Sequence, residues 1–272
     1  MKTSLSILLI VFLSCAQSES TKNAKDDLKS ESTIGDTTQV DTSKPSQIDD
    51  IDTVTINSFS LEFQPSDSVS LSEVFGDDSL RNQMVDSLPN THESAVTIER
   101  YLSQQFGAYF EANDSLLVLT LEGNNRLSFP RKWDENRVDE AGQVVYSFAH
   151  YYASIDYFLL HEQWYEGDGY VLVNRKNGYK LFIIGLPYIS PTQNRILIIN
   201  SDLEAGYTTN GIQMLSVSGD TLRTDFSLEI ANWEPTGAKW LSDEELLLEK
   251  SFLSTSDNES LWPKKYTRLT IK

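Results

Sequence analysis

The segment from Tyr157 to Ile184, YFLLHEQWYEGDGYVLVNRKNGYKLFII, decides the fold class of this chain. Its runs of Val, Ile, Leu, Tyr and Phe are short and are separated by Gly, Asn and Asp, which is the pattern of strands joined by tight turns. Asn177-Gly178 is a hairpin signal because both central residues of a type I′ turn need a positive φ. Gly167-Asp168-Gly169 favours a turn similarly. The segment therefore predicts consecutive antiparallel strands at Tyr157–Tyr165, Tyr170–Asn174 and Tyr179–Ile184.

The same alternation of short apolar runs and turn residues continues on both sides of this segment. It predicts an all-β domain over residues 91–272, built as an antiparallel meander. We expect further strands at Leu116–Leu121, Val144–His150, Arg195–Asn200, Gly211–Val217, Thr221–Leu228, Glu245–Phe252 and Lys265–Ile271. Residues 53–90 are less regular, and we expect a strand and short helices there, because a rough helical stripe of apolar residues lies between Ser66 and Pro89.

Three stretches share an order of aromatic residue, tight turn and buried strand: PYISPTQNRILI at 187–198, AKWLSDEELLL at 238–248 and, more loosely, YASIDYFLL at 152–160. This order resembles the aromatic-Ser-Pro-Asp-Gly unit of WD40-like and TolB-type propeller blades. The resemblance implies a propeller-like fold, either partial or small, since roughly four blades are needed to close a ring. A sandwich or barrel is the alternative, because turns in any antiparallel meander also favour Ser, Pro and Asp.

The N-terminus has the layout of an export signal. Lys2 precedes an apolar run from Leu5 to Ser14, too short for a bilayer span of about 20 residues, and Cys15 follows directly. Leu13-Ser14-Cys15 resembles a bacterial lipobox, with Phe12 where that family prefers Leu, Val or Ile. The resemblance implies a signal peptide over residues 1–14 and a lipidated Cys15. The alternative is an ordinary signal peptide with a chance cysteine near its end.

Residues 15–52 lack aromatic residues and are dominated by Ser, Thr, Asp, Lys and Gln. Such a composition cannot bury enough apolar surface to offset the entropy of ordering, so we expect a disordered tether. As a flexible coil it would span roughly 30–40 Å. The chain carries a net charge of -18, which disfavours nucleic acid and anionic lipid surfaces as partners.

Two further resemblances favour a bacterial cell envelope. The stretch from Val145 to Leu248 is similar to a group of uncharacterised bacterial envelope proteins through Gln163-Trp164-Tyr165-Glu166-Gly167, Leu172-Val173-Asn174, Gly185-Leu186-Pro187 and Asp202-Leu203-Glu204-Ala205-Gly206-Tyr207. Asp-Ser/Thr-aliphatic triplets such as Asp67-Ser68-Val69 and Asp86-Ser87-Leu88 resemble the O-glycosylation acceptor of exported Bacteroidetes proteins. Neither resemblance implies an activity.

No catalytic signature stands out, and we expect no metal and no cofactor. The histidines lack ligand spacing, and Cys15 is the single cysteine, so neither a zinc site nor a disulfide framework is indicated. No Gly-rich phosphate loop or nucleophile elbow occurs. Carboxylate pairs, Asp156 with Glu162 or Glu166 with Asp168, leave glycan hydrolysis open as an alternative.

Binding residues are better candidates than catalytic ones. The loop at 201–210 is longer than most connections, and long loops often carry binding sites, so Asp202, Glu204, Tyr207 and Asn210 form the first-choice patch. Glu166 and Asp168 in a second loop are further candidates, because carboxylate oxygens there could also contact a ligand. Aromatic residues either provide stacking surfaces or fill the core; the series is Tyr151, Tyr152, Trp164, Tyr165, Tyr170, Tyr188, Trp233 and Trp240.

Together these observations predict a lipid-anchored protein of the cell envelope, at the outer membrane and on its periplasmic or surface face. Its β domain would bind or scaffold an envelope protein or glycan without catalysis. An envelope glycan hydrolase that uses loop carboxylates and a purely structural envelope protein are the alternatives.

Overall fold

A computed structural model describes residues 52–66, 92–134, 142–165, 167–253 and 263–272 of the chain. All of these belong to one compact unit, residues 37–272. The expected signal peptide, Cys15 and all but the last residue of the expected tether lie outside the described residues. So do most of the segment in which short helices were expected, and Glu166.

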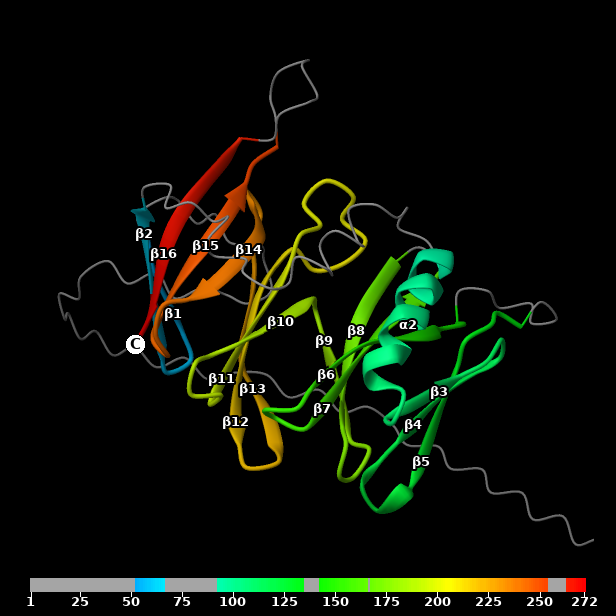
Figure 1. The fold of residues 1–272 in the computed structure, drawn as a ribbon. Helices are drawn as coiled ribbons and strands as arrows, with labels where there is room; N and C mark the ends of the chain where they lie inside the picture. The colour runs from blue at the N-terminus through cyan, green and yellow to red at the C-terminus, as the bar shows by residue number, and fades with distance from the viewer. Residues whose placement is uncertain (1–51, 67–91, 135–141, 166, 254–262) are drawn as a thin grey trace, which may run out of the picture. The chain divides into compact units, whose positions relative to one another are not determined.

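The described chain forms strands, one α-helix and one short 3-10 helix (Figure 1). In chain order these are β1 (Asp52–Ile56), β2 (Phe59–Ser66), α2 (His92–Phe106), β3 (Phe110–Ala112), β4 (Leu116–Thr120), η2 (Glu122–Asn124), β5 (Arg126–Pro130), β6 (Val145–Tyr152), β7 (Tyr157–Trp164), β8 (Gly167–Asn174), β9 (Lys180–Ile183), β10 (Leu186–Ile189), β11 (Arg195–Asn200), β12 (Gly211–Ser218), β13 (Thr221–Glu229), β14 (Glu234–Trp240), β15 (Glu245–Ser251) and β16 (Lys264–Ile271).

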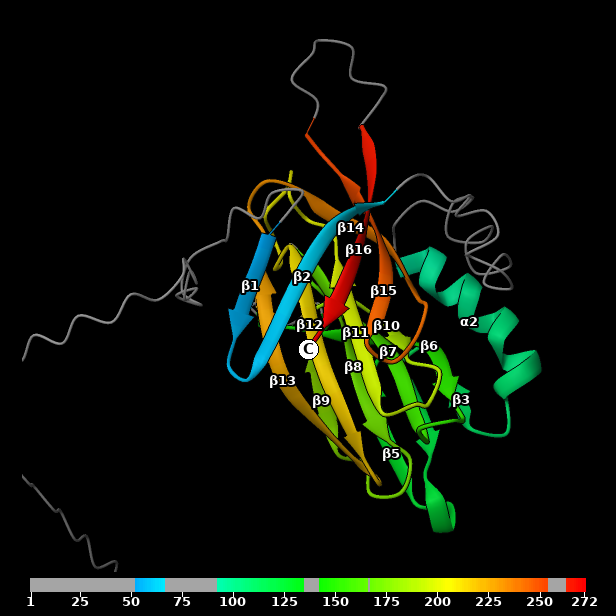
Figure 2. The same ribbon diagram turned by 90° about the vertical axis from the view of Figure 1, so that its left-hand side faces the viewer.

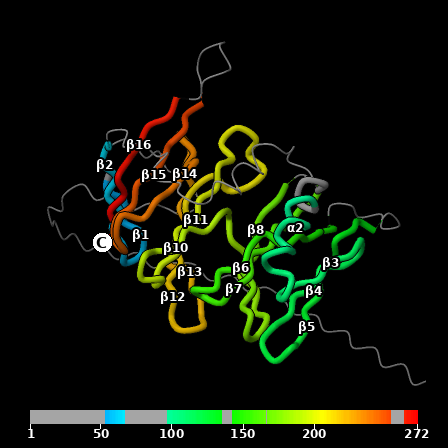
Figure 3. The backbone as a smooth tube through the Cα atoms, viewed as in Figure 1, coloured from blue at the N-terminus to red at the C-terminus, as the bar shows by residue number. Residues whose placement is uncertain are grey.

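The strands build four antiparallel sheets, which we call sheet I (β3-β4-β5), sheet II (β6-β7-β8-β9), sheet III (β10-β11-β12-β13) and sheet IV (β1-β2-β16-β15-β14). Sheets I, II and III are simple meanders, and Figure 3 traces the chain through sheets II and III in turn. Sheet IV combines the two ends of the described chain, because β2 pairs with β16, with Leu61 opposite Ile271 (Figure 2). The expected all-β antiparallel meander is therefore confirmed.

Successive sheets pack on one another through buried side chains. The packing order I–II–III–IV follows from core clusters represented by Leu119 with Phe158, Leu159 with Ile198, and Ile212 with Leu248. Within the described residues no core cluster joins sheet I to sheet IV. A sandwich has two packed sheets and a barrel is one closed sheet, so four antiparallel sheets packed in series favour the propeller-like alternative.

The apolar pattern of several strands matches the position of their sheets. Sheets II and III bury both faces, and residues 157–160 of β7 and 196–199 of β11 are accordingly buried without interruption. Sheet IV has a core cluster on one face, and β2 alternates, with Leu61 and Phe63 buried and Gln64 exposed. Burial of one such large apolar side chain contributes about 1.5–3 kcal/mol, so contacts between sheets are the main source of stability.

The sequence repeats correspond to equivalent structural units. Each repeat is a hairpin at one edge of a sheet: β6–β7, β10–β11 and β14–β15. Neighbouring copies also touch, because Trp240 Nε1 donates to Tyr188 O at 2.8 Å and Thr192 N donates to Asp243 Oδ1 at 3.1 Å. Gln193 has a φ of 63° and stands where the propeller unit has glycine, which explains how the turn persists although the motif departs from Asp-Gly.

The helix α2 was not expected. It packs beside β6 and contributes Phe106 to the core shared by sheets I and II. Its Glu99 is buried and forms an ion pair with Arg131, and Glu99 Oε1 also accepts a hydrogen bond from Phe148 N at 2.9 Å. Strands β3, β5, β10 and β14 were also not specified as separate strands, whereas every strand expected within residues 91–272 is present.

Candidate functional site

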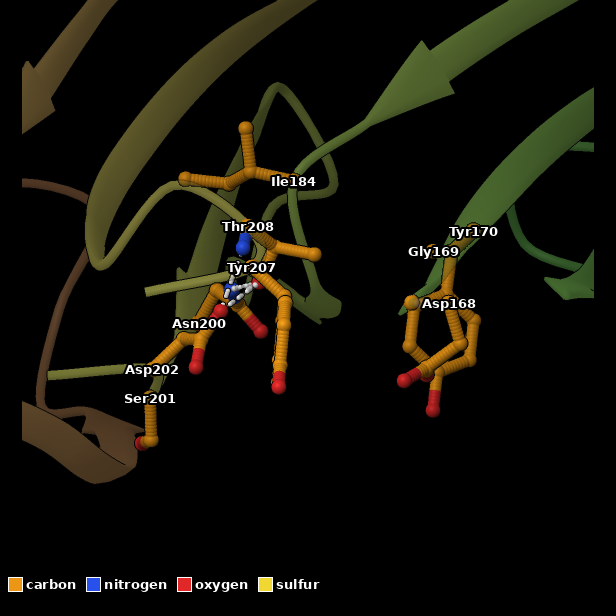
Figure 4. A pocket seen from close by; sticks show the side chains of 10 residues that line it. Asp168, Gly169, Tyr170, Ile184, Asn200, Ser201, Asp202, Tyr207 and Thr208 are labelled. Atoms are coloured by element: carbon orange, nitrogen blue, oxygen red, sulfur yellow. Dashed lines mark hydrogen bonds between the residues drawn. The ribbon is translucent and has the colours of Figure 1, made fainter. Parts of the chain in front are cut away.

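A hollow opens at the rim between sheet II and sheet III, with a volume of about 200 Å³. One wall is the start of β8, and the other is the end of β11 with the loop that follows it (Figure 4). Its lining residues are Gly167, Asp168, Gly169, Tyr170, Ile184, Asn200, Ser201, Asp202, Tyr207 and Thr208. Pockets for drug-sized ligands usually measure about 300–1,000 Å³, so this hollow fits a small group or one end of a larger ligand.

The β8 wall is shaped by two glycines. Gly167 and Gly169 lie across from Trp164 and Glu162 in the β7–β8 ladder, and a Cβ at Gly167 would meet the Trp164 indole at 2.8 Å. The indole therefore packs directly on the backbone of this strand end. Tyr170 and Asp168 alternate with the glycines and point to the other face, towards sheet III.

Asp168 is held by a neighbouring histidine. His161 Nε2 and Asp168 Oδ2 are 2.8 Å apart, and the His161 ring contacts that of Tyr170 with centroids 5.3 Å apart. The side chain of His161 is 20% exposed and that of Asp168 is 46% exposed. One carboxylate oxygen of Asp168 is therefore oriented by His161, while the side chain stays accessible from the hollow.

The opposite wall is a loop organised by Asp202. Its Oδ1 accepts a hydrogen bond from Gly206 N at 3.1 Å, and its Oδ2 accepts from Thr208 N and, at 2.7 Å, from Thr208 Oγ1. Asn210 closes the loop, since its buried Nδ2 donates to Ile230 O and Trp233 O at 2.7 and 2.9 Å. This framework holds Tyr207 outward, and Tyr207 is 66% exposed.

The structure thus brings together Asp202 and Tyr207 of the loop at 201–210 with Asp168, which was expected in a second loop and lies in strand β8. Glu204 is exposed but does not line the hollow. Asn210 is buried, and its amide is used inside the loop. Ile184, Asn200, Ser201 and Thr208 line the hollow and were not proposed as site residues, and Tyr170 was named only in the aromatic series.

The carboxylate pair Asp156 and Glu162 does not form a hydrolytic centre. Asp156 lies in the turn before β7, where it accepts from Tyr151 OH and Arg175 Nε. Glu162 is six residues further along the strand, a separation of about 20 Å at 3.3 Å per residue. Glycoside hydrolysis needs carboxylates about 5–9.5 Å apart, so this pair is too far apart.

Among the residues that the structure describes, no group of His, Cys, Asp and Glu side chains is arranged to hold a metal ion. In the same part of the chain, no helix has the length and hydropathy to cross a bilayer.

Several carboxyl groups have a raised pKa. Burial is the main cause for Glu99 and Glu162. Burial also raises the pKa of Glu234, and the charges of Asp202 and Glu204 raise it further, against a hydrogen bond from Leu203 N. The rim beside the hollow is therefore a region of negative potential.

Lowering the pH from about 7 to about 5 should stabilise the fold. Glu162 and Glu234 each have a raised pKa in the folded chain. The folded chain therefore binds protons more readily than the unfolded chain. The free energy of unfolding increases as the pH falls from the folded pKa values towards the pKa of glutamate in the unfolded chain. Lower pH also weakens repulsion in a chain of net charge -18. Thermal melts from pH 8 to pH 4 at constant ionic strength should show a rise in Tm.

At still lower pH the trend should reverse. Burial alone would raise the pKa of Glu249, but hydrogen bonds from Lys264, Thr236 and Tyr266 outweigh it and hold the pKa low. A group with a lowered pKa loses its stabilising effect as the pH falls through that pKa. Glu162→Gln removes one of the carboxyl groups with a raised pKa, so it should reduce the rise in Tm between pH 7 and pH 5. A Tm that falls steadily from pH 8 to pH 5 would contradict the prediction.

No family model and no curated protein matches this chain. Among solved structures, the chain is similar to the crystal structure of TolB from Acinetobacter baumannii, at 10% sequence identity and a TM-score of 0.19. The match covers 57% of this chain and 40% of the TolB chain. A likeness at this TM-score carries no argument about function.

Proposed function

We propose that this chain is a lipid-anchored protein of a bacterial cell envelope whose β domain binds an envelope partner without catalysis. The observation that carries the binding proposal is the hollow between sheets II and III, which has Tyr207 on one wall and Asp168 on the other. Both side chains are accessible; His161 orients Asp168, and the hydrogen bonds of Asp202 order the loop that carries Tyr207. Preformed positions of this kind reduce the entropy that binding costs.

The anchoring proposal depends on the sequence. Leu13-Ser14-Cys15 supplies the attachment point, and the polar residues up to Asp52 supply a spacer. The first strand of the described residues is β1, whose neighbour β2 pairs with β16 in sheet IV. The sheets resemble propeller blades, and we propose that the chain is a propeller-like envelope lipoprotein of Bacteroidetes type.

The binding proposal can be tested with the full chain purified from membranes in detergent and immobilised. An envelope extract, separated into protein and glycan fractions, is passed over it, and the retained components are identified by mass spectrometry. The double variant Asp168→Asn/Tyr207→Ala should retain about tenfold less of the component that the wild type retains, because accessible aromatic and charged anchors contribute most of the energy of an interface.

A matched control is Asp114→Asn/Tyr179→Ala. Asp114 is exposed in the β3–β4 turn, and Tyr179 is 53% exposed after the β8–β9 turn, at the other end of β8 from the hollow. The control should behave as the wild type, and both variants should keep the wild-type Tm. Equal retention by the hollow variant and the wild type would exclude the hollow as the binding site. Release of new reducing ends from the glycan fraction would favour the hydrolase alternative.

A further inference from the structure

Three polar side chains of the hollow, those of Asn200, Ser201 and Thr208, leave no donor for a ligand. Asn200 Nδ2 donates to Thr208 Oγ1 and to Thr209 O, each at 2.8 Å. Thr208 Oγ1 in turn donates to Asp202 Oδ2 at 2.7 Å, and Ser201 Oγ donates to Pro235 O at 2.6 Å. The amide and hydroxyl donors of Asn200, Ser201 and Thr208 are thus all used within the protein.

Two acceptors remain on opposite walls. Asp168 uses Oδ2 with His161, and its Oδ1 has no hydrogen-bond partner among the described residues. Asn200 has both amide hydrogens engaged, and its Oδ1 likewise has no partner in the described part of the chain. A carboxylate and an amide oxygen only accept hydrogen bonds, so the complementary ligand is one that donates.

The charge and the aromatic ring of the lining residues favour a cationic donor among the possible ligands. None of the described lining residues is basic, and Asp168 and Asp202 are both acidic. Asp202 is satisfied by neutral donors of its own loop, so its charge is not cancelled by a cation there. Tyr207 adds an accessible ring, and aromatic faces attract ammonium and guanidinium groups.

We propose that the hollow binds a cationic group, an ammonium or a guanidinium, through Asp168 Oδ1, Asn200 Oδ1 and the ring of Tyr207. This inference rests on the proposed function, because it names the chemistry that the same hollow recognises. The group can be the end of a lysine or arginine side chain of a partner protein or the end of a free amine. A sugar fits less well, since its hydroxyl groups also need donors, which the hollow does not offer from Asn200, Ser201 or Thr208.

The test is a titration of the full detergent-purified chain, followed by ligand-observed NMR, with n-butylammonium, n-butylguanidinium, 1-butanol and glucose as probes. The cations should bind at least about tenfold more tightly than 1-butanol, which has the same chain without charge. Binding should weaken as NaCl is raised from 20 to 500 mM, because salt screens exposed charges.

Variants assign the contact to the hollow. Asp168→Asn should weaken cation binding about tenfold, whereas Asp114→Asn removes the same charge elsewhere and should have no effect. Tyr207→Ala should weaken binding by about twofold to fivefold and Tyr207→Phe should not, since the phenylalanine ring keeps its attraction for a cation at an exposed site. Equal binding of 1-butanol or glucose, or equal affinities of Asp168→Asn and the wild type, would overturn the proposal.

Two arms distinguish the source of the cation. The probes are the blocked tripeptide acetyl-Gly-Lys-Gly-amide and cadaverine, and tighter binding of one of them assigns the group to a polypeptide or to a free amine. Failure of every cation, together with hollow-dependent retention of an envelope component, would overturn this inference and leave the proposed function intact. Cation binding by the hollow without retention of any envelope component would support this inference and count against the proposed function.

Discussion

Replacing Cys15 by alanine should transfer this protein from the membrane fraction to the soluble fraction. Cys15 is the single cysteine, so no other residue of the chain could carry a thioether-linked lipid. Stable anchoring needs two or more acyl chains, each contributing about 0.8 kcal/mol per buried methylene. Loss of these chains should therefore abolish attachment. The measurement is ultracentrifugation of cell lysates with immunoblotting of the pellet and the supernatant.

Phe12→Leu is the matched control for the anchor. It keeps Cys15 and moves the signal closer to the lipobox pattern, in which Leu, Val or Ile precedes the small residues. This variant should stay in the membrane and be processed at least as completely as the wild type. If Cys15→Ala remained in the pellet and left it only with detergent, the lipoprotein proposal would fail. Wild type in the supernatant would favour an ordinary signal peptide with a chance cysteine.

The strands were predictable because both their burial and their turns are encoded locally. Uninterrupted apolar runs such as 196–199 mark strands buried on both faces, and these belong to the inner sheets II and III. The alternation of Leu61, Glu62 and Phe63 marks a strand with one core face, and it belongs to sheet IV. The apolar period alone does not order the sheets, because residues 246–251 of β15 in sheet IV are buried without interruption and β13 in sheet III alternates.

The helix α2 was missed although local signals for it exist. Glu93 follows Asn90 by three residues, which is the spacing of a capping box, and Gly107 directly follows the last helical residue. Leu102 and Phe106 are four residues apart and pack into the same core. The aromatic residues of this segment favour strands equally well, so the end signals are more informative here than composition.

The site could be predicted only in part because its walls are distant in the sequence. Asp168 and Asp202 were recognised as loop carboxylates, but their common position depends on how sheet II packs on sheet III. Asn210 shows the opposite difficulty. It is polar and lies at a loop end, yet its side chain is buried and supports the backbone at Ile230 and Trp233. Sequence identifies candidate oxygen atoms but not which of them face solvent.

The largest change in stability should come from Glu99→Gln, at about 3–5 kcal/mol of the free energy of unfolding. Glutamine keeps the size of the side chain and an oxygen that can accept from Phe148 N, so the variant removes little beyond the charge. Arg131 then keeps its charge at 7% side-chain exposure without a counter-ion. Urea unfolding monitored by tryptophan fluorescence measures the loss. The exposed pair Glu111 and Arg126 is the control, and Glu111→Gln should change stability little, because solvent screens it.

The double variant Glu99→Leu/Arg131→Met separates the charge from the hydrogen bonds. Replacing a buried ion pair with apolar residues of similar volume is often neutral, so the double variant should be more stable than Glu99→Gln. It should not reach the wild type, since Phe148 N loses its acceptor and an unsatisfied buried donor costs about 1–3 kcal/mol. Asn113 O also loses the hydrogen bond from Arg131 Nη1. A double variant as unstable as Glu99→Gln would mean that the pair holds α2 to sheets I and II mainly through these backbone contacts, and the buried charge would then be of minor importance.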